Sequence, residues 1–296
     1  MGGSSMPREK SSGFFFWGGG KMKQTAWDHD LLLESPYPVI TEEPVSWGRK
    51  GERLTLAERH KAIVDANSGK VFSIVSQDYR VIRHENAIER VEEAINRVEA
   101  LRNYVVRTFF YNDGGRMLRE YTFEDHKIAI KPGDLVKLTL YLRNSYDLTW
   151  PLEVYLGALR LVCKNGLFAG IKLFKFRTRH VQTIENLPLK HEVTTALNRF
   201  AQQADVWKKW TDVQLTRKVH EKVMATMAMG EKAADDIRDS MDVQCRGWDK
   251  AGFPIVSLWV FFNILTWYIT HRAVSLNHRV AMEERLRRAI MNFRSR

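Results

Sequence analysis

The sequence predicts an α+β fold, in which an antiparallel β-sheet follows one helix and a helical C-terminal half packs on that sheet. Three observations predict it. Apolar residues recur at helical spacing over residues 86–101, two β-rich runs flank an Asn-Asp-Gly-Gly turn at residues 112–115, and the chain beyond Pro188 has helical periodicity. A group of strands followed by a group of helices is typical of α+β proteins and not of doubly wound parallel sheets.

The composition of the 296-residue chain fits one large domain or two smaller ones. Apolar residues make up 44% of it, which is ample for a core and excludes disorder along the whole chain. The formal net charge is +11, and a basic balance of this size favours a nucleic acid or an anionic membrane as partner. The alternative is a soluble protein that happens to be basic.

The N-terminal region carries few periodic signals. Residues 1–22 are rich in Gly and Ser and are expected to be flexible, while residues 23–50 are rich in Pro and Trp and are expected to be irregular. Residues 55–66 are expected to form a short helix, and residues 71–75 a brief strand.

The middle of the chain supplies the strands of the predicted sheet. Residues 104–111 and 116–123 are expected to pair as a hairpin, because Gly in the turn between them tolerates the positive φ that such turns demand. A second turn is expected at Pro132-Gly133-Asp134. After it, apolar and polar side chains alternate over residues 136–142, which predicts a half-buried strand.

Two later segments, residues 154–163 and 171–177, complete the predicted sheet, although residues 156–163 fit a helix equally well. Beyond Pro188 the expected helices cover residues 192–210, 213–228, 231–241 and 254–293, the last with a break near residues 273–277. The predicted organisation is therefore an irregular N-terminal segment (residues 1–50), an α+β sheet domain (51–188) and a helical region with a basic tail packed on the sheet (189–296).

The apolar stretch over residues 253–270 has two interpretations. It contains no charged residue, and its length is near the lower limit for a membrane span. However, Pro254, Ser257 and Asn263 interrupt it, and a helix that is apolar on nearly all sides is equally typical of the core of a large domain. We expect this stretch in the core and expect no membrane partner.

The strongest functional hint is a stretch without acidic residues between Glu153 and Glu185. It contains the alternating segment Phe174-Lys175-Phe176-Arg177-Thr178-Arg179. In an extended strand alternate residues point to opposite faces, so the three cations would share one face while the two Phe side chains pack inward. A row of cations on a rigid sheet suits a polyanion backbone. The candidate nucleic-acid-binding residues are Arg160, Lys164, Lys172, Lys175, Arg177 and Arg179, with Arg285 and Arg288 from the C-terminal tail.

The C-terminal tail is the second basic feature. From Arg272 to Arg296 seven Arg stand against Glu283 and Glu284. The spacing of these carboxylates to the following Arg residues favours a solvated helix with internal ion pairs. The alternative is that the positive charges of these Arg side chains strengthen binding to a polyanion.

A polar loop joins the candidate site, formed by Asn144, Ser145 and Asp147 together with Asn165. Such side chains most simply cap turns by bonding to nearby backbone groups. The functional alternative is a loop beside the basic strand that contacts a phosphate or a sugar. Neighbouring aromatic residues are candidates for stacking on unpaired bases, although each also suits the core: Phe109, Tyr111, Tyr141 and Trp150.

Three segments carry a family resemblance. They are Asn144-Ser145-Tyr146-Asp147, Arg160-Leu161-Val162-Cys163-Lys164-Asn165-Gly166-Leu167, and the segment over residues 263–271. In this order, over roughly residues 70 to 290, the chain resembles the phage/plasmid-like protein family called domain of unknown function 932. The resemblance implies a cytoplasmic protein encoded by a bacteriophage or another mobile element. It implies no mechanism, because the family is defined by sequence alone.

Signatures of catalysis do not stand out. The sequence has no phosphate-binding loop, no nucleophile elbow, no zinc-binding helix and no Cys-x-x-Cys spacing. We therefore predict no catalytic residue, no metal and no cofactor, which disfavours an enzyme. Cys163 and Cys245 are too few and too far apart for a disulfide framework, and no secretory signal is convincing, so the cytoplasm of a bacterial host is the expected compartment.

Two function hypotheses of different classes follow. The leading one is a phage- or plasmid-encoded nucleic-acid-binding accessory protein, with single-stranded DNA in recombination or replication as the expected partner. The alternative is a non-enzymatic factor that binds a host protein and antagonises a host defence complex, because a Trp-rich N-terminal region suits a protein interface. Association into a homo-oligomer is compatible with both.

Overall fold

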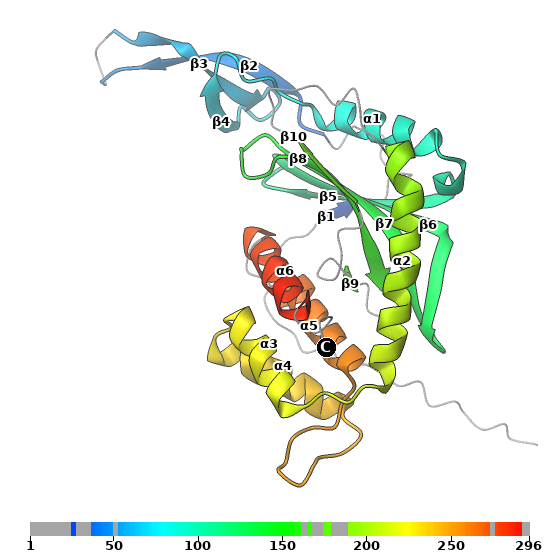
Figure 1. The fold of residues 1–296 in the computed structure, drawn as a ribbon. Coiled ribbons are helices and arrows are strands. Elements are labelled where there is room, and N and C mark those ends of the chain that lie inside the picture. The colour runs from blue at the N-terminus through cyan, green and yellow to red at the C-terminus, as the bar shows by residue number, and fades with distance from the viewer. Residues whose placement is uncertain are drawn as a thin grey trace, which may run out of the picture.

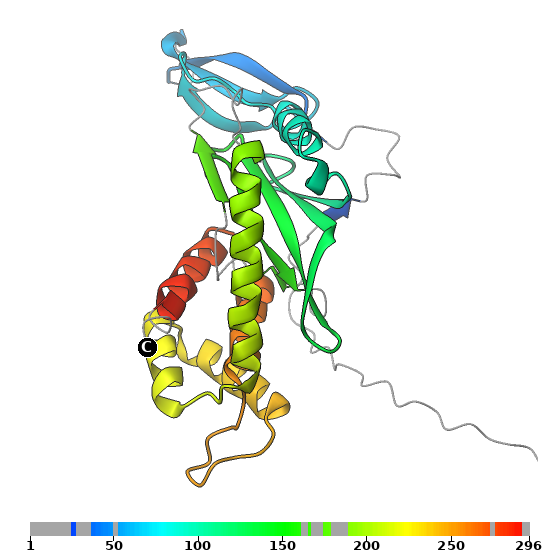
Figure 2. The same cartoon turned by 45° about the vertical axis from the view of Figure 1, so that its right-hand side comes forward.

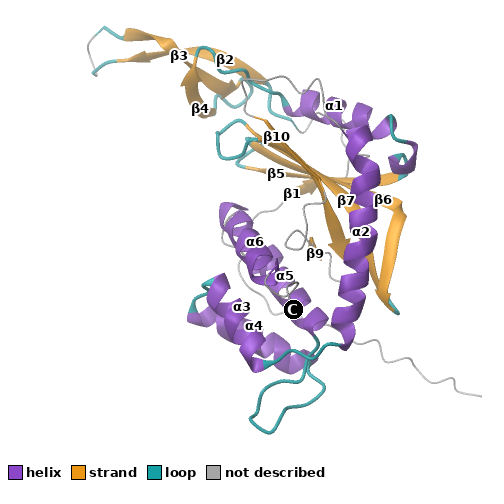
Figure 3. Ribbon diagram, viewed as in Figure 1, coloured by secondary structure: helices purple, strands orange, loops and turns teal. Residues whose placement is uncertain are grey.

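The computed structural model contains two antiparallel sheets and a set of helices, which confirms the predicted α+β class (Figure 1). Strands dominate the first part of the chain and helices the second, as Figure 3 shows by colour. The structure describes residues 25–27, 37–49, 53–160, 165–166, 174–178, 189–272 and 276–291.

The larger sheet is a meander of neighbouring strands with one added strand at each end. Its strand order is β1-β5-β6-β7-β8-β10, and β9 also pairs with β8. The strands are β1 (Thr25–Trp27), β5 (Tyr104–Tyr111), β6 (Arg116–Lys131), β7 (Asp134–Ser145), β8 (Leu152–Arg160), β9 (Asn165–Gly166) and β10 (Phe174–Thr178).

The smaller sheet has the order β2-β3-β4 and lies beside α1 (Figure 1). It contains β2 (Ile40–Trp47), β3 (Thr55–Asp65) and β4 (Val71–Ser76). The helices are α1 (His84–Asn96), α2 (Leu189–Asp212), α3 (Arg217–Met227), α4 (Glu231–Gln244), α5 (Leu258–Arg272) and α6 (Leu276–Met291), and a 3₁₀ turn, η2 (Glu99–Leu101), follows α1.

The predicted hairpin is confirmed as β5 and β6. Asn112, Asp113 and Gly114 all have positive φ in the turn between them, the backbone that the Asn-Asp-Gly-Gly sequence accommodates best. A side chain at Gly114 is excluded by space as well, because a Cβ there would lie 2.8 Å from Cδ of Pro38. The second turn, at Pro132-Gly133-Asp134, is also confirmed between β6 and β7.

Two predictions for the N-terminal region are wrong. The sequence predicts that the segment 23–50 is irregular. Its described residues 25–27 form β1, and most of its described residues 37–49 form β2. The segment 55–66 forms β3 up to Asp65 and not a short helix, because β3 pairs with β2 on one side and β4 on the other. This pairing overrides the helix preference of its Leu, Ala, Glu, Arg and Lys residues.

Two further predictions for the sheet are corrected or settled. The strand over residues 136–142 is not half-buried: Thr139 and Tyr141, on its polar side, are as buried as Leu138 and Leu140. The cause is its central position in β7, between the long strands β6 and β8. The ambiguous stretch after residue 156 is strand up to Arg160 and not helix, because β8 pairs with both β7 and β10.

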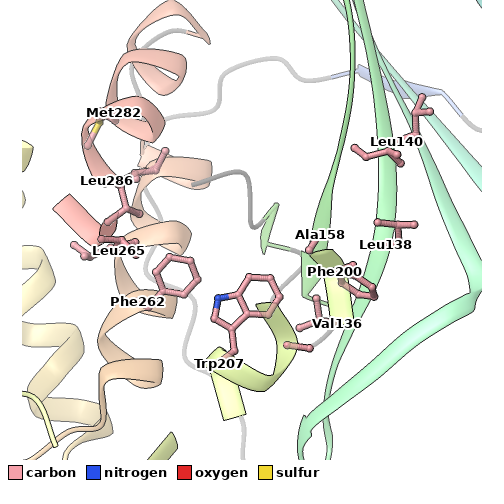
Figure 4. Packing of buried hydrophobic residues seen from close by; sticks show 14 of the residues in the cluster. Val136, Leu138, Leu140, Ala158, Phe200, Trp207, Phe262, Leu265, Met282 and Leu286 are labelled. Carbon is pink, nitrogen blue, oxygen red and sulfur yellow. The ribbon is translucent and has the colours of Figure 1, made fainter. Parts of the chain in front are cut away.

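The helical half packs on one face of the larger sheet, as predicted. α2 runs from α1 down to the group formed by α3 to α6, and Figure 2 shows the same arrangement after rotation. In the core, Trp207 of α2 lies between Phe262 of α5 and the sheet residues Val136 and Ala158 (Figure 4). α5 begins at Leu258 and not at residue 254, and it ends at Arg272, next to the predicted break.

The apolar stretch over residues 253–270 lies in the core as expected. α5 has 15 residues, and Trp259, Phe262 and Leu265 on it are almost completely buried. Among the helices in the described part of the chain, none has both the length and the apolar character that crossing a membrane requires.

Candidate functional site

The basic strand predicted from the alternating segment is β10, which pairs with β8 at the end of the described sheet. Phe176 is partly buried and packs against the main core, whereas Arg177 is exposed. The predicted alternation is therefore seen at these two positions. The side chain of Lys175 and the whole of Arg179 lie outside the described residues.

We call the sheet face that carries Arg177 the ionic face, because most of its long side chains are charged. Strand register places Arg177 opposite Glu153, and Glu153 opposite Arg143, so the three side chains form a row across β10, β8 and β7. The described ionic face comprises Arg107, Phe109, Tyr111, Arg116, Leu118, Glu120, Lys137, Tyr141, Arg143, Glu153, Tyr155 and Arg177.

Most cations of the ionic face are paired with carboxylates of the same chain. Nη2 of Arg107 lies 2.7 Å from Oε2 of Glu120, and Nζ of Lys137 lies 2.5 Å from Oε2 of Glu124. The Glu153 carboxylate, which is completely buried, is paired with Arg143. The predicted basic surface therefore does not spread from β10 across the sheet, because β5 to β8 neutralise their own charges.

Arg177 differs from these neighbours. It is exposed, and within the described residues it makes no ion pair. Arg143, and not Arg177, is paired with Glu153, the carboxylate that Arg177 faces across the strand pair. Arg177 is thus the predicted cation whose position the described structure supports most directly.

The aromatic side chains of the ionic face divide into buried and accessible ones. The rings of Tyr141 and Tyr155 stack with their centroids 5.1 Å apart, and Tyr141 is completely buried. Trp150, which lies next to the face, is 3% exposed and packs edge-on to Tyr111. Tyr141 and Trp150 are therefore core residues in this structure. Phe109 and Tyr111 are partly exposed and pack against Leu118, Tyr141 and Tyr155 with the rest of their surface, so only the exposed part of each is accessible.

The predicted polar loop forms a buried junction. Asn144 is completely buried, and its Nδ2 donates to the carbonyl of Ile82 at 2.8 Å and to Nδ1 of His84 at 3.0 Å. Since Nδ1 of His84 accepts, its Nε2 carries the proton and donates to the carbonyl of Gly114 at 2.9 Å. Asn144 therefore ties β7 to the start of α1 and to the hairpin turn.

The next two residues extend this junction. The hydroxyl of Ser145, also completely buried, accepts from the amide of Trp150 and donates to its carbonyl, both at 3.0 Å. The hydroxyl of Tyr146 accepts from the amide of His84 at 2.8 Å. Tyr146 also packs with Ile40, Ile63 and Val75, which joins the smaller sheet to the rest of the protein. Asn144 and Ser145 accordingly face the interior and not the solvent.

Asp147 closes the loop with four hydrogen bonds. Its Oδ2 accepts from Nε of Arg116 at 2.5 Å and from Nδ2 of Asn112 at 2.9 Å, and its Oδ1 accepts from the amide and hydroxyl of Thr149. Burial works against the ionised form of Asp147, but the bonds from Thr149 and Arg116 prevail and lower its pKa below the ordinary 3.8.

We expect Asp147→Asn to lower the free energy of unfolding at neutral pH by about 1–3 kcal/mol, because the amide cannot accept all these bonds and loses the ion pair. A lowered folded-state pKa means that this contribution is present above pH 3.8 and is lost as the pH falls through the folded pKa. Urea unfolding at pH 7 and at decreasing pH measures it. Asp113→Asn in the neighbouring turn is the control, since the Asp113 side chain is 86% exposed. Equal effects of both substitutions at pH 7 would contradict the assignment.

Of the other predicted site residues, only some have side chains that the structure describes. Arg160 stands opposite Asn165 in the pairing of β8 with β9, and the side chains of both lie outside the described residues. Lys164 and Lys172 lie outside them altogether. On α6, Arg285 donates to the carbonyl of Met227 at 3.1 Å.

Arg288 belongs to an ion-pair cluster on α6. Its Nε lies 3.4 Å from Oε1 of Glu284, which Arg287 also contacts at 2.6 Å. The hydrogen bond from Arg287 is the main cause that lowers the pKa of Glu284 to about 2. Arg288 thus has an internal partner, as expected for a solvated helix face, and in this respect it differs from Arg177.

Sequence reasoning missed the partners that neutralise the ionic face. Glu153 was visible only as the last carboxylate before the acid-free stretch. A hairpin centred on Leu148 would have placed residue 143 opposite residue 153, which is the register observed. Among the described residues, no three His, Cys, Asp or Glu side chains are grouped so that they could hold a metal ion.

Comparison with known families gives one match. A family model described as "Domain of unknown function (DUF932)" matches residues 71–291, from β4 to the end of α6. The matched range includes the whole ionic face and the buried junction around Asn144. No curated protein and no solved structure is significantly similar to the chain.

Proposed function

The chain belongs to the family called domain of unknown function 932, and from its charge and the position of Arg177 we propose that it is a nucleic-acid-binding accessory protein. Its proposed setting is the cytoplasm of a bacterial host, where a phage or plasmid encodes it. Its proposed partner is single-stranded DNA during recombination or replication. No catalytic role is part of the proposal.

The observation that carries the proposal is the exposed Arg177 on β10. A cation held on a strand and not neutralised within the described residues is suited to a phosphate, and such contacts supply affinity without sequence information. The flanking Lys175 and Arg179 add charge in the same acid-free segment. Phe109 and Tyr111 are partly exposed on the same face, and aromatic side chains that stack on unpaired bases would favour single strands.

The test is retention on single- and double-stranded oligonucleotides across a salt series. A protein that makes several phosphate contacts should lose affinity on the order of a thousandfold between low and moderate salt. Charge reversal of Lys175, Arg177 and Arg179 together should weaken binding. It should also make the slope of log affinity against log salt shallower, by about 1 for each phosphate that the variant no longer binds.

The matched control reverses three exposed cations on helices far from β10 in the sequence, with the variant K218E/K222E/K232E. Both variants change the net charge equally, so any shared loss of affinity reflects net charge alone. A specific loss in the β10 variant supports the proposed interface. Identical binding by the two variants would remove β10 from it.

The second candidate is a protein-binding factor that antagonises a host defence complex. The observation that favours it is a pair of exposed apolar residues near the end of α4: Val243 in its last turn is 85% exposed, and Trp248 after it is 59% exposed. Trp is among the residues that contribute most at protein interfaces. The same salt series separates the candidates, because a protein partner requires no steep dependence of nucleic-acid retention on salt.

A further inference from the structure

The end of the β2–β3 hairpin extends beyond the smaller sheet as a two-stranded ribbon. β4 pairs with β3 only as far as His60, opposite Ser76, whereas β2 and β3 continue to pair at Ser46–Leu56 and Trp47–Thr55. Figure 1 shows the two strands projecting from the body at the upper left. We call Trp47, Arg49, Arg53, Leu54, Leu56 and Arg59 the ribbon tip.

The ribbon tip exposes large apolar side chains on both of its faces. Trp47 is 66% exposed, Leu54 61% and Leu56 54%. Trp47 shares a face with Thr55, so Leu56, the next residue of β3, points to the other face. A two-stranded ribbon is marginally stable in water by itself, and this one has no packing partner among the described residues. A tip that is apolar on both faces is suited to insertion between two surfaces and not to contact with a single one.

The charges around the tip indicate which partner it enters. Arg49, Arg53 and Arg59 are all exposed, and none of them forms an ion pair within the part of the chain that the structure describes. Residues 45–59 contain four cations (Arg49, Lys50, Arg53, Arg59) and two carboxylates (Glu52, Glu58), a net charge of +2. Nearer the body, by contrast, Lys61 is paired with Glu42 at 2.7 Å.

We infer that the ribbon tip is the element that enters a nucleic acid, with its apolar side chains against bases and its Arg side chains on phosphates. Side chains at the end of a ribbon can reach between unpaired bases, and an aromatic ring such as that of Trp47 can stack on them. The inference rests on the proposed nucleic-acid binding and adds a second contact, on a different sheet from β10. The tip contacts both bases and phosphates, whereas β10 contacts the phosphate backbone.

The experiment compares full-length variants in binding to single-stranded and duplex oligonucleotides at several salt concentrations. W47A/L54A/L56A should lower affinity by at least about tenfold and leave the salt slope unchanged, because it removes side chains that touch bases and none that touches a phosphate. R49Q/R53Q/R59Q should instead make the salt slope shallower by up to about 3. Both variants change only exposed side chains and should unfold cooperatively like the unsubstituted protein, which thermal unfolding checks.

The matched control is V39A/I74A, which removes exposed apolar side chains from the body of the smaller sheet, 47% and 54% exposed, and should bind as the unsubstituted protein does. Full affinity in both tip variants, with binding by the unsubstituted protein intact, overturns the role of the tip and leaves the proposed function standing. Failure of the unsubstituted protein to bind any oligonucleotide at low salt overturns both.

Parallel measurements on the same proteins test two other partners, a lipid surface and a second copy of the chain. If the tip variants lose binding to phosphatidylserine vesicles while their DNA affinity is unchanged, the tip contacts a lipid surface and the inference is wrong. If their mass in solution falls from an oligomer to a monomer with DNA affinity unchanged, the tip contacts a second copy of the chain and the inference is equally wrong.

Discussion

Replacing Trp259 by Ala should lower the free energy of unfolding by about 3–5 kcal/mol. Trp259 is 1% exposed, and its ring packs with Trp207 and Phe262, with centroids 5.8 and 5.9 Å away. Its indole N–H donates to Oδ2 of Asp134 at 2.8 Å, so the substitution also removes a buried hydrogen bond between α5 and the start of β7. Urea unfolding measures the loss.

Trp267 on the same helix provides the matched control. Its side chain is 36% exposed and stacks on His271 one turn later, so Trp267→Ala should cost much less than Trp259→Ala. Trp259→Phe keeps most of the packing and removes the donor to Asp134, which isolates a hydrogen bond worth about 1–3 kcal/mol. A near-neutral Trp259→Ala would mean that α5 does not pack on the sheet in solution.

Replacing Arg143 by Met should be comparably damaging, with a loss of about 3–5 kcal/mol, because it removes the ion-pair partner of a completely buried carboxylate. Met fills a similar volume, so the loss of stability measures the removal of the charge and not the creation of a cavity. Most of the Arg143 side chain is itself buried, at 13% exposure, which limits the water that could replace it. Thermal or urea unfolding at neutral pH measures the change.

Two further variants separate the charge from the packing. The double substitution Arg143→Met with Glu153→Leu removes both ions and should recover most of the stability, since buried ion pairs are often no more stable than apolar residues of similar size. Arg177→Met, which faces the same carboxylate from β10 but is exposed, should have little effect. Equal losses in the single and double variants would show that Glu153 does not depend on Arg143.

The parts of the fold that the sequence predicts are those fixed by local chemistry. The β5–β6 hairpin follows from a turn in which Asn112, Asp113 and Gly114 each adopt positive φ, and three residue types suited to that backbone stand together in the chain. α1 follows from a stripe of apolar residues that becomes its buried face, and only its boundary differs, since it starts at His84 and ends at Asn96.

Features that depend on partners distant in sequence could not be predicted in the same way. Most residues over 56–62 of β3 favour a helix, and the segment is a strand because it pairs with β2 and β4. The same limit applies to the candidate site. Whether Arg143 or Arg177 stays available to a ligand depends on which one reaches Glu153, and that is decided by strand register.

The place of β10 at the end of the described sheet has a consequence for solubility. A terminal strand offers backbone donors and acceptors to which a strand of another molecule can add, and repeated addition leads to polymerisation. A charge that projects from such a strand opposes lateral association, because two molecules aligned edge to edge would bring like charges together and remove them from water. Arg177 is therefore suited to keep neighbouring molecules apart.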